Sequence, residues 1–182
     1  MEWNKDNSVL NEAFRIKGHA RVWSDIEVIL PIRPHYVIAG GYFTSIMHKE
    51  TPKDIDIFII NPPRDLDSWL ISRYGLNNNI SSYKKPSSAY IKNDMIKDVY
   101  NFGHKIESVP VQIIVTKYKT REELISHFDY AHCCVSYYPE TDKLYMSEKT
   151  YKAIIEKRLV VNNPTSVVEW RKQKFLKRGF KE

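Results

Sequence analysis

Two short apolar segments, the first ending in a double glycine and the second opening with two aspartates, constrain the fold of this chain most. Residues 37–39 run into Gly40 and Gly41. They predict a strand, a tight turn and then a helix over 44–49. Such a turn leaves backbone N–H groups unpaired at the positive end of a helix, where a phosphate is favoured. The second segment, residues 54–60, predicts another strand.

The aspartates of the second segment, Asp54 and Asp56, are separated by one residue. Strand side chains alternate between faces, so both carboxylates point the same way, with Cα atoms roughly 6.5–7 Å apart. Two such carboxylates repel each other unless a divalent cation lies between them. The glycines alone predict a turn, and the aspartates alone predict a solvated strand edge. Together they favour a phosphate and metal site for chemistry on a nucleoside triphosphate.

The composition fits a globular protein with a polyanionic partner. The chain has 182 residues, 42% hydrophobic and 13% aromatic, which is enough for one substantial core. Its formal net charge of +6 favours a partner such as nucleic acid without requiring one.

The cysteines, Cys133 and Cys134, are adjacent in the sequence. On a strand they would point to opposite faces, which disfavours a disulfide between them. His132 and Cys134 would share a face near His127, but this spacing matches no paired zinc-ligand pattern. We therefore expect core cysteines in a reducing compartment. The polar start of the chain and the lack of a long apolar run predict a soluble cytoplasmic protein with no membrane partner.

The pattern along the chain predicts one α+β domain over 1–182, with a core over about 35–160 and helical extensions over about 7–30 and 165–178. Residues 111–115 are almost continuously apolar, which predicts a strand buried on both faces. Thr120 begins a capping-box pattern. The expected helices are 7–16, 23–30, 44–49, 65–74, 120–128, 147–159 and 165–177, and the expected strands are 36–39, 54–60, 80–83, 89–91, 99–102, 109–116, 129–138 and 143–146.

The spacing of the glycines and aspartates resembles a known signature. A double glycine, a gap of twelve residues and then Asp-apolar-Asp-apolar is similar to the motif of the DNA polymerase β-type nucleotidyltransferase superfamily. A weaker likeness over 110–114 and 128–134 resembles small nucleotidyltransferase-like proteins of viruses, including bacteriophages. The resemblance implies a small mixed sheet with helices packed on one side, and the host cytoplasm as location if the protein is viral.

The resemblance also implies site residues. Gly40 and Gly41 would hold the triphosphate of the nucleotide. Asp54 and Asp56 would bind two Mg²⁺ ions, or Mn²⁺ in their place, as catalytic metals. From their positions alone, Thr44 and Ser45 are candidate hydroxyl donors to the phosphates, and Lys53 is a candidate phosphate contact.

The superfamily uses a third carboxylate, and here its identity is open. The strand that resembles the usual one carries Gln112, whose amide has no anionic oxygen. Asp129 is the best substitute as metal ligand and catalytic residue, although a turn aspartate is the alternative. Glu107 is a further candidate that fits a solvated turn.

These residues imply a metal-dependent nucleotidyltransferase that transfers a nucleoside monophosphate from a nucleoside triphosphate to a hydroxyl. An RNA or tRNA end is preferred slightly over a protein or small-molecule acceptor. The alternative is a non-catalytic nucleotide- or RNA-binding protein, or a host-interaction protein, that keeps the fold. A chain of this size leaves little protein to hold a long nucleic acid, so a protein partner is compatible with either hypothesis.

Basic and aromatic residues gather near the end of the chain. Aromatic rings stack on bases and cations follow phosphates, as RNA binding requires. The competing interpretation is an amphipathic helix that packs on the core and exposes its lysines, and both hold if opposite faces are used. The residues are Trp170, Arg171, Lys172, Lys174, Phe175, Lys177, Arg178, Phe180 and Lys181.

Overall fold

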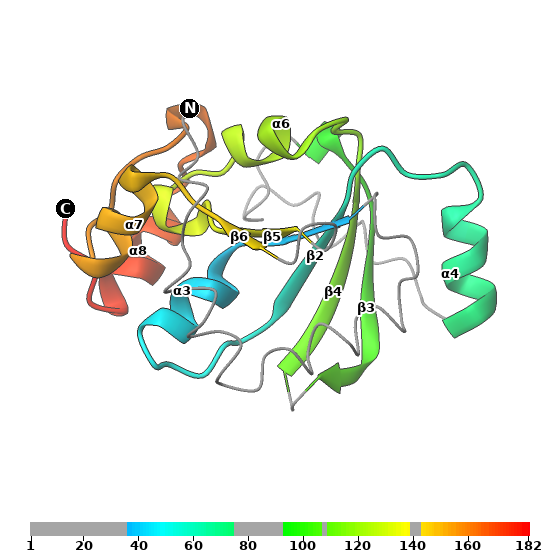
Figure 1. The fold of residues 1–182 in the computed structure, drawn as a ribbon, viewed down its shortest axis with the longest axis horizontal. Coiled ribbons are helices and arrows are strands. Elements are labelled where there is room, and N and C mark those ends of the chain that lie inside the picture. The colour runs from blue at the N-terminus through cyan, green and yellow to red at the C-terminus, as the bar shows by residue number, and fades with distance from the viewer. Residues whose placement is uncertain (1–35, 75–92, 107–108, 139–142) are drawn as a thin grey trace.

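A computed structural model of the chain describes residues 36–74, 93–106, 109–138 and 143–182 (Figure 1). In these residues six strands form one sheet in the order β3-β4-β2-β1-β5-β6. The β2–β4 pair is parallel and the other pairs are antiparallel, so the sheet is mixed, as the resemblance implied. The strands are β1 Tyr36–Ala39, β2 Ile55–Ile59, β3 Ile96–Ile106, β4 Val109–Thr116, β5 Ser136–Tyr138 and β6 Lys143–Tyr145.

Helices connect and cover these strands. Helices α7 and α8 lie beside α3 at one end of the molecule, and α4 lies at the other end beside β3 (Figure 1). Asp67 attaches α4 to β3, since it accepts hydrogen bonds from Lys97 at 2.6 Å and Tyr100 at 3.2 Å. The helices are α3 Gly41–Met47, α4 Leu66–Tyr74, α6 Arg121–Ser126, α7 Glu148–Ile155 and α8 Glu169–Lys177, with 3₁₀ turns at Asn93–Met95, Ala131–Cys133 and Pro164–Ser166.

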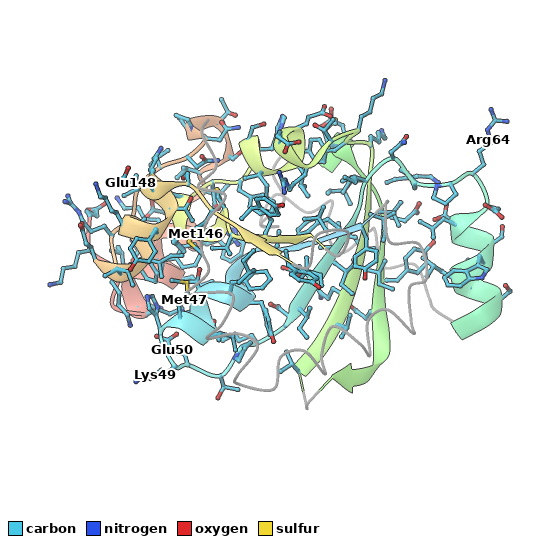
Figure 2. All side chains as sticks on the ribbon, viewed as in Figure 1. Met47, Lys49, Glu50, Arg64, Met146 and Glu148 are labelled. Carbon is cyan, nitrogen blue, oxygen red and sulfur yellow. The ribbon has the colours of Figure 1, made fainter. Side chains whose placement is uncertain are left out.

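The alternation of apolar residues along the strands builds a core on each face of the sheet. Ile38 and Ile57 pack with α3, α4 and α7 on one face. Their strand neighbours Val37 and Phe58 pack with α6 on the other face. In Figure 2 the labelled Met47 and Met146 belong to the first face, while Arg64 points away from the sheet. The central strands are therefore buried on both sides.

A third apolar cluster joins the C-terminal helix to the rest of the fold. Phe175 and Phe180 pack against Tyr130 and Cys133 of the Ala131–Cys133 turn region, and all four side chains are buried. Both cysteines are free and buried, as expected for core cysteines. None of the described helices has the length and apolar character needed to cross a membrane.

The structure confirms the strands expected at 36–39, 54–60, 109–116 and 143–146, within a residue or two at their ends. It also confirms the cap at Thr120, whose hydroxyl accepts from the Glu123 N–H at 3.2 Å. The expected helices over 7–16 and 23–30 and the short strands over 80–83 and 89–91 lie outside the described residues.

The strand expected over 129–138 is wrong for its first half. Tyr130 forms an isolated bridge with Val161, and a 3₁₀ turn follows before β5 begins at Ser136. The Asp129 carbonyl accepts backbone N–H groups of residues 162 and 163, so this segment pairs with the chain after α7. Helix α7 also ends earlier than expected, and the last expected helix is divided into a 3₁₀ turn and α8.

The cap of α6 gives a direct test of local stability. Thr120→Ala removes the acceptor for the Glu123 N–H, and we expect the free energy of unfolding to fall by about 1 kcal/mol. Urea unfolding followed by circular dichroism measures this. Thr120→Ser keeps the hydroxyl and should behave like the wild type, and an equal loss in both variants would contradict the cap assignment.

Candidate functional site

The turn between β1 and α3 is built around Gly40. This residue caps α3 with φ 95° and ψ −154°, a backbone conformation that is essentially restricted to glycine. A Cβ added at Gly40 would lie 3.4 Å from Oδ2 of Asp56. The turn and the aspartate strand therefore touch, and glycine permits this approach. Gly41 follows as the first residue of α3, with open space around its Cα.

The two aspartates lie at the start of β2. Asp54 precedes the strand and is exposed, and Asp56 is partly buried with its Oδ1 atom shielded from solvent. Asp56 is paired with Ala39 of β1 on one side and with Gln112 of β4 on the other. The pair is thus held at the end of β2 that faces the glycine turn. Carboxylate oxygens at such a place are ligands that Mg²⁺ prefers.

Gln112 occupies the position beside Asp56 on the parallel strand. Its amide donates a hydrogen bond to Oδ1 of Asn101 on β3 at 3.1 Å, and the two residues are register partners. Asp56, Gln112 and Asn101 therefore lie in one row across the three neighbouring strands β2, β4 and β3. An amide offers a neutral oxygen where a carboxylate would offer a negative one.

Asp129 has different partners from the aspartates of β2. Its side chain is 3% exposed, and both carboxylate oxygens accept from the guanidinium of Arg171. Oδ1 also accepts from the Tyr130 N–H at 2.9 Å. In the part of the chain that the structure describes, no three His, Cys, Asp or Glu side chains form a group able to hold a metal. The structure does not gather Asp129 with Asp54 and Asp56, and Arg171 is the charged partner of its carboxylate instead.

The hydroxyls of α3 are also used within the fold. Thr44 donates to the carbonyl of His132, and Ser45 donates to the carbonyl of Gly41 at 3.1 Å. Each hydroxyl has one proton to donate, and both side chains are buried. Thr44 thereby attaches α3 to the Ala131–Cys133 turn, while the bond from Ser45 to Gly41 lies within α3 itself. Lys53, by contrast, is exposed beside the aspartates.

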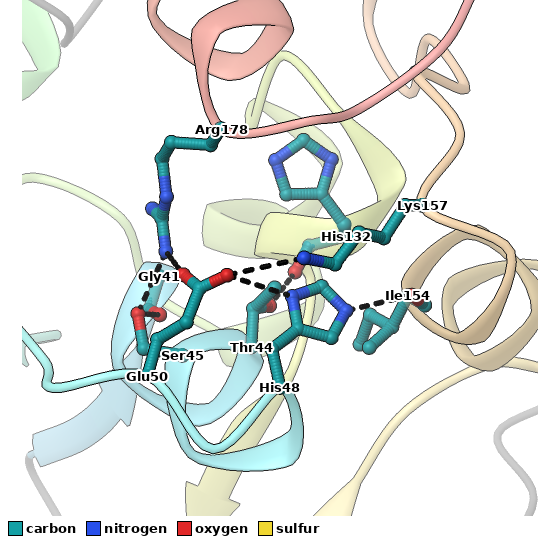
Figure 3. A network of polar contacts seen from close by, with 9 residues as sticks. All are labelled: Gly41, Thr44, Ser45, His48, Glu50, His132, Ile154, Lys157 and Arg178. Atoms are coloured by element: carbon teal, nitrogen blue, oxygen red, sulfur yellow. Dashed lines mark hydrogen bonds and ion pairs between the residues drawn. The ribbon is translucent and has the colours of Figure 1, made fainter.

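A charged cluster, which pattern analysis of the sequence did not identify, ties α3 to the C-terminal region (Figure 3). Glu50 accepts hydrogen bonds from Arg178 at 2.7 Å and from Lys157 at 3.1 Å. Arg178 also donates to the Ser45 hydroxyl at 3.0 Å, and His48 donates through Nε2 to the Ile154 carbonyl at 2.8 Å. The hydrogen bond from Arg178, more than that from Lys157, lowers the pKa of the Glu50 carboxyl.

His132 is almost completely buried, with 1% of its surface exposed. Its ring is within 4.2 Å, centroid to centroid, of both Phe175 and Phe180. Neither ring nitrogen has a hydrogen-bond partner in the described residues. Burial, reinforced by the nearby Arg171 charge, holds the pKa of His132 well below its ordinary value of 6.5. The ring is therefore neutral and acts as an aromatic core residue.

The Gabija anti-defense 2 (Gad2) family model matches residues 10–157, which is most of the chain. This chain belongs to the Gad2 family. The match includes the glycine turn, both aspartates, Gln112 and Asp129, and it ends before α8.

Solved structures of low sequence identity share the fold of this Gad2 family member. A CCA-adding enzyme in complex with ATP is 11% identical with a TM-score of 0.55, covering 98% of this chain and 46% of the other. A Thermotoga maritima CCA-adding enzyme complexed with tRNA is 13% identical with a TM-score of 0.54, covering 91% and 38%. A tRNA nucleotidyltransferase complexed with a primer tRNA and an ATP analog is 15% identical with a TM-score of 0.50, covering 79% and 40%.

These likenesses show the nucleotidyltransferase fold that the glycine and aspartate motif implied. The chain spans less than half of the length of each of these structures. A comparison with curated proteins finds no match.

The two glycines of the turn are expected to respond differently to substitution. Gly40→Ala forces a side chain into a glycine-only conformation, which costs about 1–3 kcal/mol. Gly41→Ala meets no atom within 4 Å and lies in a helix, so stability should be unchanged or raised by up to about 1 kcal/mol. Thermal unfolding of both variants measures this difference. Equal stability of the two would contradict the turn geometry.

Glu50 makes the stability of the fold depend on pH. Because its pKa in the folded state is lowered from 4.5, the ion pairs stabilise the fold above that pH and lose their effect as the pH falls further. We expect Glu50→Gln to be less stable than wild type at pH 7, with the difference shrinking below pH 4.5. Urea unfolding across this range measures it. Glu156→Gln, at an exposed position, should show no such convergence.

Proposed function

We propose that this Gad2 family member is a metal-dependent nucleotidyltransferase. It transfers a nucleoside monophosphate from a nucleoside triphosphate to a hydroxyl, with an RNA or tRNA end as the preferred acceptor. The observation that carries the proposal is the contact between the turn and the aspartate strand, where a Cβ on Gly40 would lie 3.4 Å from Asp56. A phosphate at the turn would thereby lie next to the metal ligands.

The side chains at this site fit a divalent cation. Asp54 and Asp56 supply hard, negatively charged oxygens, and Asp56 is held from both sides by β1 and β4. When bound, Mg²⁺ would supply charge stabilisation to the phosphates and activate the attacking hydroxyl. The role of the chain is to fix these carboxylates against a turn that admits the phosphates closely. Lys53, exposed beside the pair, adds a positive charge for the triphosphate.

The preference for RNA rests on the basic charge of the chain and on the solved structures of similar fold. Those proteins were solved with tRNA, ATP or CTP. In this chain α8 exposes Trp170 at 38% together with Lys177, which suits stacking on a base beside a phosphate. A protein partner that helps to hold the acceptor is also part of the proposal.

A second candidate function is supported by Gln112. With an amide beside Asp56 and Asp129 paired to Arg171, the chain lacks the third carboxylate of the superfamily in the described region. A non-catalytic protein that keeps the fold to bind a nucleotide or a host protein would tolerate the absence of a third carboxylate. The family description, Gabija anti-defense, names the process in which such an interaction would act.

Replacing both aspartates tests the enzyme hypothesis. We expect Asp54→Asn combined with Asp56→Asn to lower label transfer by several orders of magnitude, because the metal loses its anionic ligands. The assay combines purified protein, Mg²⁺ or Mn²⁺, a nucleoside triphosphate labelled at the α-phosphate, and cellular RNA and protein as acceptors. Gln112→Asn, which keeps an amide, is the control and should retain transfer.

The same double variant separates the two functions in cells. If nucleotidyl transfer serves the anti-defense role, the variant should fail to protect a virus from the Gabija defence. If the chain acts by binding a host protein, protection should survive the loss of both aspartates. A folded wild-type protein that transfers no label to any acceptor, yet still protects, would reject the enzyme hypothesis.

A further inference from the structure

Three basic residues form one stripe along α8. Arg171, Lys174 and Arg178 are spaced by three and four residues, so their side chains lie on the same side of the helix. The two outer residues have carboxylate partners. Arg171 pairs with Asp129, and Arg178 pairs with Glu50 and the Ser45 hydroxyl.

Lys174, the middle residue, has no hydrogen bond or ion pair with any residue in the described part of the chain. Its side chain is half-buried, and its ammonium lies 5.8 Å from the centroid of the adjacent Phe175 ring. A cation that is withdrawn from water without a counterion is unfavourable. This position therefore suits an anion that binds from outside the chain.

The surroundings of Lys174 indicate where that anion would lie. The ammonium interacts electrostatically with Asp54 and Lys53 on the loop before β2, and with Arg171 on its own helix. Burial and the Arg171 charge lower the pKa of Lys174, while the Asp54 carboxylate opposes this effect. Lys174 thus has electrostatic interactions with the loop that carries the first aspartate of the candidate metal pair.

Helix α8 holds Lys174 in a fixed place. Phe175, the next residue, is 3% exposed and packs against the rings of Tyr130 and His132. Arg178, one turn later, is attached to α3 at Ser45, and Figure 3 shows this contact beside Gly41. With Arg171 paired to Asp129 before Lys174, and Phe175 and Arg178 held after it, the helix is anchored on each side of Lys174. Through Arg178 it is attached to the same α3 that begins at the glycine turn.

We propose that Lys174 is a phosphate-binding residue of the nucleotide site, which places α8 in that site as a positioning element. This inference rests on the proposed function. Lys174 would contact the triphosphate from α8, which Arg178 attaches to α3 beside the glycine turn. The family model ends at residue 157, so this contribution comes from a part of the chain that the family match does not include.

Calorimetric binding to the full chain tests the assignment. The probes are a non-hydrolysable ATP analogue with Mg²⁺, inorganic tripolyphosphate with Mg²⁺, and AMP. We expect Lys174→Gln to weaken binding of the analogue and of tripolyphosphate by roughly 10- to 100-fold, with little change for AMP. Lys174→Arg keeps the charge and should recover most of the affinity.

Lys117→Gln, which removes an exposed lysine from a different part of the fold, is the control and should bind all probes like the wild type. Lys174→Gln should also be at least as stable as the wild type to urea, because it removes a half-buried charge without a partner. A purely structural lysine would instead show lower stability and no selectivity among the probes, and this result would overturn the assignment.

The design separates two kinds of failure. If the wild type binds the analogue in a manner that requires Asp54 and Asp56, and Lys174→Gln binds it equally well, the Lys174 assignment is overturned and the proposed function stands. If the folded wild type binds neither the analogue nor tripolyphosphate, both are overturned.

Discussion

The antiparallel pairing of β1 with β2 is the constraint on which the site depends. It sets Ala39 opposite Asp56, and the chain must then turn within one residue to start α3. Gly40 makes this turn in a conformation that other residues avoid, and its missing side chain leaves the space beside the Asp56 carboxylate. The strand register therefore determines where the turn and the candidate metal ligand meet. A change of register by one residue would move Asp56 to the other face.

The C-terminal part of the chain supports this arrangement from outside. Arg178 and Lys157 converge on Glu50, which follows α3, so the helix after the turn is attached at its far end. The buried ring of His132 packs against the Phe175 and Phe180 rings, and its carbonyl accepts a hydrogen bond from Thr44 of α3. A neutral ring suits this layer, because Arg171 and Arg178 already bring positive charge close to it.

Local patterns in the sequence predict the elements that form the site, while long-range pairs escape such analysis. The strands around 37–39, 55–59 and 111–115 are recognised because they are apolar and bounded by turn residues. The partner of Asp129, 42 residues away in the sequence, and the partner of Glu50, 128 residues away, are fixed by tertiary packing. The apolar run after Asp129 resembles a strand, but backbone pairing with residues 160–163 gives it a different conformation.

Synthesis on the ribosome proceeds from the first residue to the last, and this order bears on when α8 can act. The glycine turn and the aspartates emerge early, and β4, the parallel neighbour of β2, follows about fifty residues later. Arg178, which fastens α8 to α3, emerges 128 residues after Glu50. A nascent chain can thus hold the aspartate pair in its sheet well before Arg178 is available to pair with Glu50, so α8 is added to a sheet that has already formed.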